Sequence, residues 1–104
     1  MELARVEGTV VATAKAGRLQ GRKLLLVNLT GPDTKPTNNY LVAVDSVGAG
    51  DGEIVIVVRG SSARQTDDLT NVPTDSSIVA IVDTIELRGG VVYSKDQAKE
   101  GTTR

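Results

Sequence analysis

The sequence contains neither cysteine nor histidine in its 104 residues. Without cysteine, the chain cannot form disulfides, bind a metal through thiolates or use a thiol as a nucleophile. Without histidine, it lacks the commonest general base and the commonest ligand of transition metals. Because these absences also remove the usual catalytic triads, we expect no catalytic residues, no bound metal, no cofactor and no enzymatic activity.

Aromatic residues, net charge and long apolar runs are scarce as well. Tyr40 and Tyr93 are the only aromatic side chains, and 12 basic against 13 acidic residues leave a net charge of −1. So balanced a charge does not favour nucleic acid or an anionic membrane as partner. The aliphatic runs are far shorter than the roughly 20 residues that span a bilayer, and the N-terminus does not resemble a secretory signal. We therefore expect a soluble, cytoplasmic protein.

Valine, by contrast, is abundant, with 15 copies. The run Ile54–Val58 is β-branched throughout, which suits a strand better than a helix. It shows no alternation of apolar and polar residues, so both faces of the strand require burial. A chain of this size can cover one face with its own core but hardly both. A second copy of the same chain is the expected cover for the other face.

Short strands separated by turn-forming residues predict an all-β fold. Gly8 indicates a bend or bulge in the first strand, and Arg88-Gly89-Gly90 predicts a hairpin turn. The pattern Ser62 to Gln65 fits a capping box, so one short helix should begin there and end before Pro73. With no parallel crossover signal, we predict a small antiparallel barrel, in which residues 1–94 form a single domain and residues 95–104 a flexible, polar tail. The strands are predicted at residues 4–12, 23–29, 40–44, 53–59, 77–87 and 91–93.

A glycine-rich loop, Gly48-Ala49-Gly50, precedes the fourth predicted strand. It resembles a phosphate-binding loop, but such a loop leads into a helix, whereas a strand follows here. A tight turn, or the close approach of a neighbouring subunit's backbone, is the better interpretation. Gly48, Ala49 and Gly50 are therefore candidate contacts between subunits.

The turn Gly60-Ser61-Ser62 follows the same strand, with Arg59 and Arg64 on either side. Helix capping alone explains Ser62. A helix start with small side chains and hydroxyls could equally form a narrow, polar opening if it faced a symmetry axis. The two arginines are either solvated surface charges or bidentate partners across an interface. The sequence leaves both pairs of alternatives open.

Several motifs together resemble a known family. They are Gly8-Thr9-Val10-Val11, Val47-Gly48-Ala49-Gly50 and Gly60-Ser61-Ser62-Ala63-Arg64-Gln65. Over about its first 96 residues, the chain resembles the pentameric vertex proteins of bacterial microcompartments, the EutN/CcmL family of carboxysome and ethanolamine-utilisation shells. This resemblance implies a five-stranded barrel similar to the oligonucleotide-binding (OB) fold and a ring of five subunits.

On that resemblance, we expect a structural protein whose homopentamers cap the vertices of a microcompartment shell. Its partners would be itself and hexameric shell proteins. The subunit interface would include Gly48, Ala49, Gly50, Arg59 and Arg64, while Gly60, Ser61 and Ser62 would lie at a narrow pore on the five-fold axis. The alternative is a small OB-like module that binds single-stranded nucleic acid, which needs aromatic stacking platforms and a basic groove.

Overall fold

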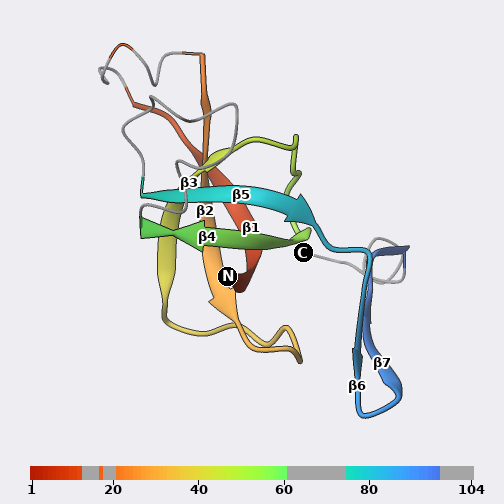
Figure 1. Ribbon diagram of the computed structural model, residues 1–104. Helices are drawn as coiled ribbons and strands as arrows, with labels where there is room; N and C mark the ends of the chain where they lie inside the picture. Colours follow the sequence, from red (N-terminus) through yellow and green to blue (C-terminus); the bar gives the residue numbers. More distant parts are fainter. Residues whose placement is uncertain (13–16, 18–20, 61–74, 97–104) are drawn as a thin grey trace.

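The computed structural model describes residues 1–12, 17, 21–60 and 75–96 (Figure 1). The predicted helix after Ser62 and most of the predicted tail lie outside these residues. Seven strands account for most of the described chain, each near a predicted position. They are β1 (Glu2–Val10), β2 (Lys23–Thr30), β3 (Tyr40–Asp45), β4 (Ile54–Arg59), β5 (Ser76–Ile81), β6 (Thr84–Leu87) and β7 (Gly90–Ser94).

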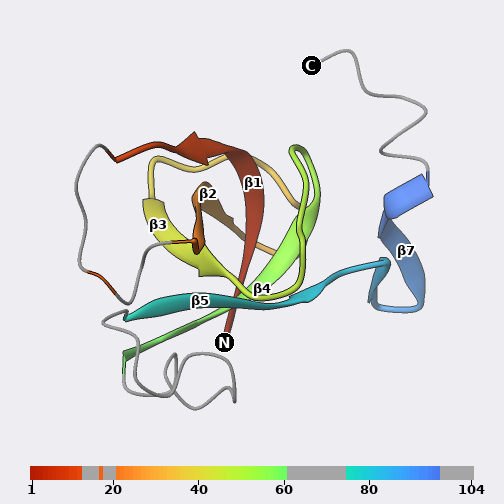
Figure 2. The same ribbon diagram turned by 90° about the horizontal axis from the view of Figure 1, so that it is seen from above.

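Five of the strands close into a barrel in the order β1-β2-β3-β5-β4 (Figure 2). This confirms the prediction of a small all-β barrel. The prediction that every pair is antiparallel is wrong for β3 and β5, which run parallel where Val44 lies opposite Ser77. The reason is geometric, because an odd number of strands cannot alternate in direction all the way around a closed ring.

Two irregularities help the strands to curve around the barrel. The register between β1 and β2 shifts between Val6 and Gly8, which confirms the predicted bulge at this glycine. A second shift, between β4 and β5, lies at Ile56 and Val57. Such bulges increase the local twist and bend of a strand, as a small barrel requires.

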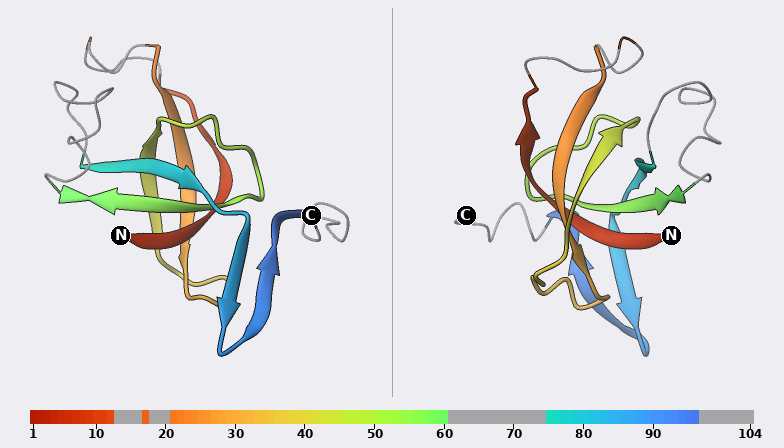
Figure 3. Two further views of the ribbon diagram at one scale, coloured as in Figure 1. Left: turned by 45° about the vertical axis from the view of Figure 1, so that its right-hand side comes forward. Right: turned by 90° about the vertical axis from the view of Figure 1, so that its left-hand side faces the viewer.

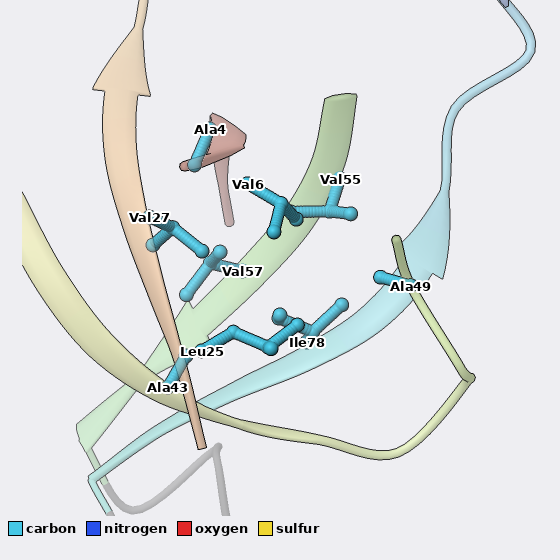
Figure 4. Packing of buried hydrophobic residues seen from close by; sticks show 9 residues of the cluster. All are labelled: Ala4, Val6, Leu25, Val27, Ala43, Ala49, Val55, Val57 and Ile78. Atoms are coloured by element: carbon cyan, nitrogen blue, oxygen red, sulfur yellow. The ribbon is translucent and has the colours of Figure 1, made fainter. Parts of the chain in front are cut away.

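The barrel core is narrow and aliphatic (Figure 4). Small and medium side chains fill it, because a five-stranded barrel leaves little space inside. The core residues alternate with outward-facing ones along the strands. Nine residues form this cluster: Ala4, Val6, Leu25, Val27, Ala43, Ala49, Val55, Val57 and Ile78.

The last two strands form a separate sheet that projects from the barrel (Figures 1 and 3). We predicted one continuous strand over residues 77–87, and this was wrong, since the strand breaks at Val82 and Asp83. Val82 still donates its N–H to the carbonyl of Ile54 at 2.8 Å, whereas the carbonyl of Asp83 accepts the N–H of Lys95 at 2.8 Å. The backbone thus leaves the barrel between these two residues. The turn at Arg88 and Gly89 is confirmed, with φ angles of 52° and 83°.

Asn28 organises the long loop between β2 and β3. Its side chain is buried, and its Nδ2 donates to the carbonyl oxygens of Thr37 at 2.8 Å and Asn39 at 3.1 Å. Its Oδ1 accepts the N–H of Thr37 at 3.0 Å. The loop is mostly exposed, but one buried amide ties its end to the barrel.

Candidate subunit interface

The glycine-rich loop is shaped by the carboxylate of Asp45, the last residue of β3. Its Oδ1 accepts the N–H groups of Val47 at 3.0 Å and Gly48 at 3.1 Å, and its Oδ2 accepts that of Ala49 at 3.0 Å. An aspartate whose carboxylate accepts the N–H groups of the residues that follow it commonly stabilises a turn. Gly48 has φ 79°, a conformation in which a side chain would be strained. The loop therefore holds its shape through contacts within one chain.

Glu53 fastens the other end of this loop. Its Oε1 accepts the N–H of Gly50 at 2.6 Å, while its Oε2 lies 3.0 Å from the Nζ of Lys95. The hydrogen bond to Glu53, together with its negative charge, raises the pKa of Lys95. Nearby, Nη1 of Arg5 donates to the carbonyl of Gly52 at 2.7 Å. One carboxylate thus links the glycine-rich loop to the end of the β6–β7 hairpin.

The three loop residues proposed as subunit contacts face different ways. Gly48 is exposed and Gly50 is half-buried. Ala49 is only 1% exposed and belongs to the core of its own barrel, so its side chain does not face outward. A neighbour approaching this loop would meet the backbone at Gly48 and Gly50.

Arg59 finds its partner within the chain. Its Nε donates to Oε2 of Glu2 at 2.5 Å and its Nη2 donates to Oε1 at 2.8 Å, so the pair is bidentate. The hydrogen bond from Arg59 lowers the pKa of Glu2, and the same contact raises the pKa of Arg59. Both side chains remain partly exposed, at the end of β4 and the start of β1. Arg59 therefore lies at the surface, but its guanidinium is already paired with Glu2 of its own chain.

Of the proposed axis residues, only Gly60 is described. It has φ 70° and its N–H donates to the carbonyl of Asp75 at 2.8 Å. This bond joins the two described residues that flank the segment 61–74. Ser61, Ser62 and Arg64 lie in that segment, outside the described residues.

Two exposed apolar patches were not singled out from the sequence. The first is on the outside of β3, where Tyr40 and Val42 are exposed. Tyr40 also lines an open depression of about 480 Å³, together with Glu2 and Arg59. The second is on the β6–β7 hairpin, where Leu87, Val91 and Val92 are exposed; Val91 pairs with Glu86 and Leu87 with Gly90, so these two side chains lie on opposite faces of the hairpin. Runs of apolar residues with no alternation were the only sequence signal for surfaces of this kind.

We also searched the described residues for a metal-binding group and for a membrane-spanning helix. Within 1–12, 17, 21–60 and 75–96, no group of three or more acidic side chains is arranged to hold a metal ion. In the same part of the chain, no helix has the length and apolar character needed to cross a membrane.

Comparison with known proteins agrees with this architecture. The family model described as ethanolamine utilisation protein EutN/carboxysome matches residues 1–83. The carboxysome shell vertex protein CcmL of Synechocystis sp. is 45% identical over 95 residues, covering 91% of this chain and 95% of the relative. The solved structure of CcmL from Nostoc sp. is 46% identical with a TM-score of 0.87, covering 91% of this chain and 100% of that one.

A further solved structure is described as the pentameric microcompartment shell protein GrpN from Rhodospirillum rubrum. It is 48% identical with a TM-score of 0.77, covering 84% of this chain and 99% of that one. The family match thus extends over most of the sequence, and the barrel superimposes on those of relatives with more than 40% identity. This chain belongs to the EutN/CcmL family.

Proposed function

We propose that this chain is a structural shell protein whose homopentamers cap the vertices of a bacterial microcompartment in the cytoplasm. Residues 1–94 would be its single shell domain, and residues 95–104 its tail. The observation that carries the proposal is the match to shell vertex proteins over nearly their whole length, for example 98% of the PduN of Salmonella typhimurium at 49% identity. GrpN, one of these relatives, is described as pentameric.

The distribution of apolar surface supports assembly. The exposed patches on β3 and on the hairpin are costly in water and are of the kind that mark protein interfaces. They differ from each other, so a contact between them is heterologous, and a heterologous contact that closes gives a ring. In a sheet of hexagonally packed hexamers, each hexamer has six neighbours. A ring of five subunits at the same position has only five neighbours, which forces the sheet to curve. Hexameric shell proteins are therefore the expected partners.

Native mass spectrometry of the purified chain tests the ring directly. We expect a species of five subunits at micromolar concentration, and a stable monomer or dimer would contradict the proposal. Electron microscopy of shells co-expressed with a hexameric shell protein tests the role. Closed polyhedra should form with this chain present, whereas open sheets or tubes should form without it.

We also propose that Gly60, Ser61 and Ser62 face the five-fold axis, and that Gly48 and Gly50 approach a neighbouring subunit. The exposed position of Gly60 and its bond to Asp75 support the first idea, because they put the two residues that flank the segment 61–74 at one place on the surface. Small side chains there would leave a narrow, polar opening. A structure of the assembled ring tests it, and serines at the outer rim would overturn it.

The relatives do not support the alternative of a nucleic-acid-binding module. They are described as shell vertex proteins, and the chain has only two tyrosines on which bases could stack. Their structural role also favours a protein without catalytic activity.

A further inference from the structure

Glu2 and Arg59 form a diagonal pair across two neighbouring strands. Glu2 of β1 lies in register with Val57 of β4, and Arg59 is two residues further along β4. Residues two apart on a strand share a face, so both charged side chains lie on the face that carries Val57. Val57 is fully buried in the barrel. The pair therefore lies at one end of the barrel core, where the start of β1 and the end of β4 lie side by side (Figure 3).

The contact between the two side chains is bidentate. Nε and Nη2 of Arg59 donate to the two carboxylate oxygens of Glu2 at 2.5 and 2.8 Å. A pair of this kind occupies one of the two edges through which a guanidinium binds anions. The hydrogen bond to Glu2 raises the pKa of Arg59, and the charge of Asp75 raises it further. The positive charge of Arg59 is thus matched by carboxylates of its own chain.

Gly60 connects this pair to the proposed opening on the five-fold axis. It follows Arg59 directly, is exposed, and donates its N–H to the carbonyl of Asp75 at 2.8 Å. Arg59 and Asp75 are therefore the immediate neighbours of Gly60, one along the chain and one through a hydrogen bond. If Gly60 faces a five-fold axis, the five copies of Arg59 lie close around that axis.

Five unpaired guanidinium groups around one axis would repel one another and attract anions. Glu2 prevents this, because it pairs with Arg59 within every subunit. We infer that Glu2 determines the charge at the five-fold opening, and that the opening takes uncharged polar solutes in preference to anions because Glu2 neutralises Arg59. The inference rests on the proposed position of Gly60 at the axis.

The variant Glu2→Gln unmasks the charge of Arg59 and tests the inference. Calorimetric titration of its pentamer with sulfate, at low ionic strength to limit screening, should show one bound anion per five chains, because five arginines share a single site. The unmodified pentamer should bind sulfate at least roughly tenfold more weakly. Five anions per pentamer, or none, would contradict the inference, since either result means that the arginines do not converge on an axis.

Asp33→Asn is the matched control. It removes the same charge as Glu2→Gln, but from an exposed loop, so an effect of net charge alone is equal in both variants. Its pentamer should bind sulfate no better than the unmodified one. Equal sulfate binding by the two variants would overturn the role of Glu2.

Arg59→Gln gives the converse test. It leaves the carboxylates of Glu2 without their partners, so magnesium should bind in place of sulfate, again once per five chains. The double variant Glu2→Gln/Arg59→Gln should bind neither ion more tightly than the unmodified pentamer does. Magnesium binding by Arg59→Gln that is no tighter than in the double variant would count against convergence of the pairs.

Repulsion between unmasked arginines could also break up the Glu2→Gln ring at low ionic strength. In that case sulfate should restore pentamers in native mass spectrometry, whereas chloride at the same ionic strength should not. Circular dichroism should show a folded barrel in each variant, since both side chains are partly exposed. A folded Glu2→Gln chain that sulfate does not reassemble would overturn the inference.

The outcomes separate the two proposals. If the unmodified chain forms pentamers, but Glu2→Gln and Asp33→Asn bind sulfate alike, the role of Glu2 is overturned and the shell function stands. An unmodified chain that stays monomeric under native mass spectrometry overturns both.

Discussion

The Oε2 of Glu53 lies 3.0 Å from the Nζ of Lys95, joining the start of β4 to the end of β7. The other oxygen of the same carboxylate accepts the N–H of Gly50 at 2.6 Å. Residues 42 positions apart in sequence thus meet where the glycine-rich loop, the barrel and the hairpin come together. This contact gives the hairpin its direction relative to the barrel.

Replacing Lys95 with methionine should loosen the base of the hairpin. Because the pKa of Lys95 is raised by Glu53, the ion pair stabilises the fold below the ordinary lysine value of 10.5 and stops doing so as the pH rises through the raised value. The variant should therefore unfold at a lower temperature than the parent chain at neutral pH, and the difference should shrink at strongly alkaline pH. Lys35→Met, in an exposed loop, is the control and should show no such pH dependence. An equal effect of both variants would contradict the role of the ion pair.

The contribution of the Glu2–Arg59 ion pair to the stability of the fold should change at acidic pH. The hydrogen bond from Arg59 lowers the pKa of Glu2, so the pair stabilises the fold above the ordinary glutamate value of 4.5 and is lost as the pH falls through the lowered value. Glu2→Gln should reduce thermal stability slightly at neutral pH, and the difference should vanish in strong acid and shrink at high salt. A difference that persists in acid would mean that Glu2 acts by packing.

Removing the carboxylate of Asp45 should disturb the glycine-rich loop. Asp45→Ala leaves three N–H groups without their acceptor, which should cost about 1–2 kcal/mol in the free energy of unfolding. Asp33→Ala is the control, because within the described part of the chain Asp33 accepts a single N–H, that of Lys35 in an exposed loop. Denaturant titration measures both variants, and equal losses would argue against a special role for Asp45.

Alanine at the two loop glycines should separate backbone strain from contact with a neighbour. Gly48→Ala should cost about 1 kcal/mol, because Gly48 has φ 79°. A Cβ at Gly50 would lie 3.5 Å from Oε1 of Glu53, an ordinary contact, so Gly50→Ala should fold almost unchanged. If Gly50 faces a neighbouring subunit, Gly50→Val should then reduce the pentamer fraction while the barrel stays folded. Normal assembly of that variant would mean that the loop is only a turn.

Much of the fold could be predicted from local patterns in the sequence. The β-branched run at Ile54–Val58 indicated a strand, Gly8 indicated a bulge, and Arg88-Gly89 indicated a hairpin turn. Each of these signals depends on backbone preferences of a few neighbouring residues. The lack of alternation at Ile54–Val58 indicated a strand that needs a partner, but the exposed apolar side chains of the structure lie elsewhere, on β3 and on the β6–β7 hairpin.

Other features were decided only when distant segments met. The parallel pairing of β3 and β5 follows from closing a ring of five strands, and the break at Val82 and Asp83 follows from bonds to Ile54 and Lys95. Nothing near Arg59 in sequence pointed to Glu2, and nothing near Lys95 pointed to Glu53. By itself the sequence determined the strands, the turns and the need for a partner, because these depend on local sterics and hydrophobicity. Only the tertiary structure decided the ion pairs, the direction of the hairpin and which apolar surfaces stay exposed, because these depend on which residues far apart along the chain are brought into contact.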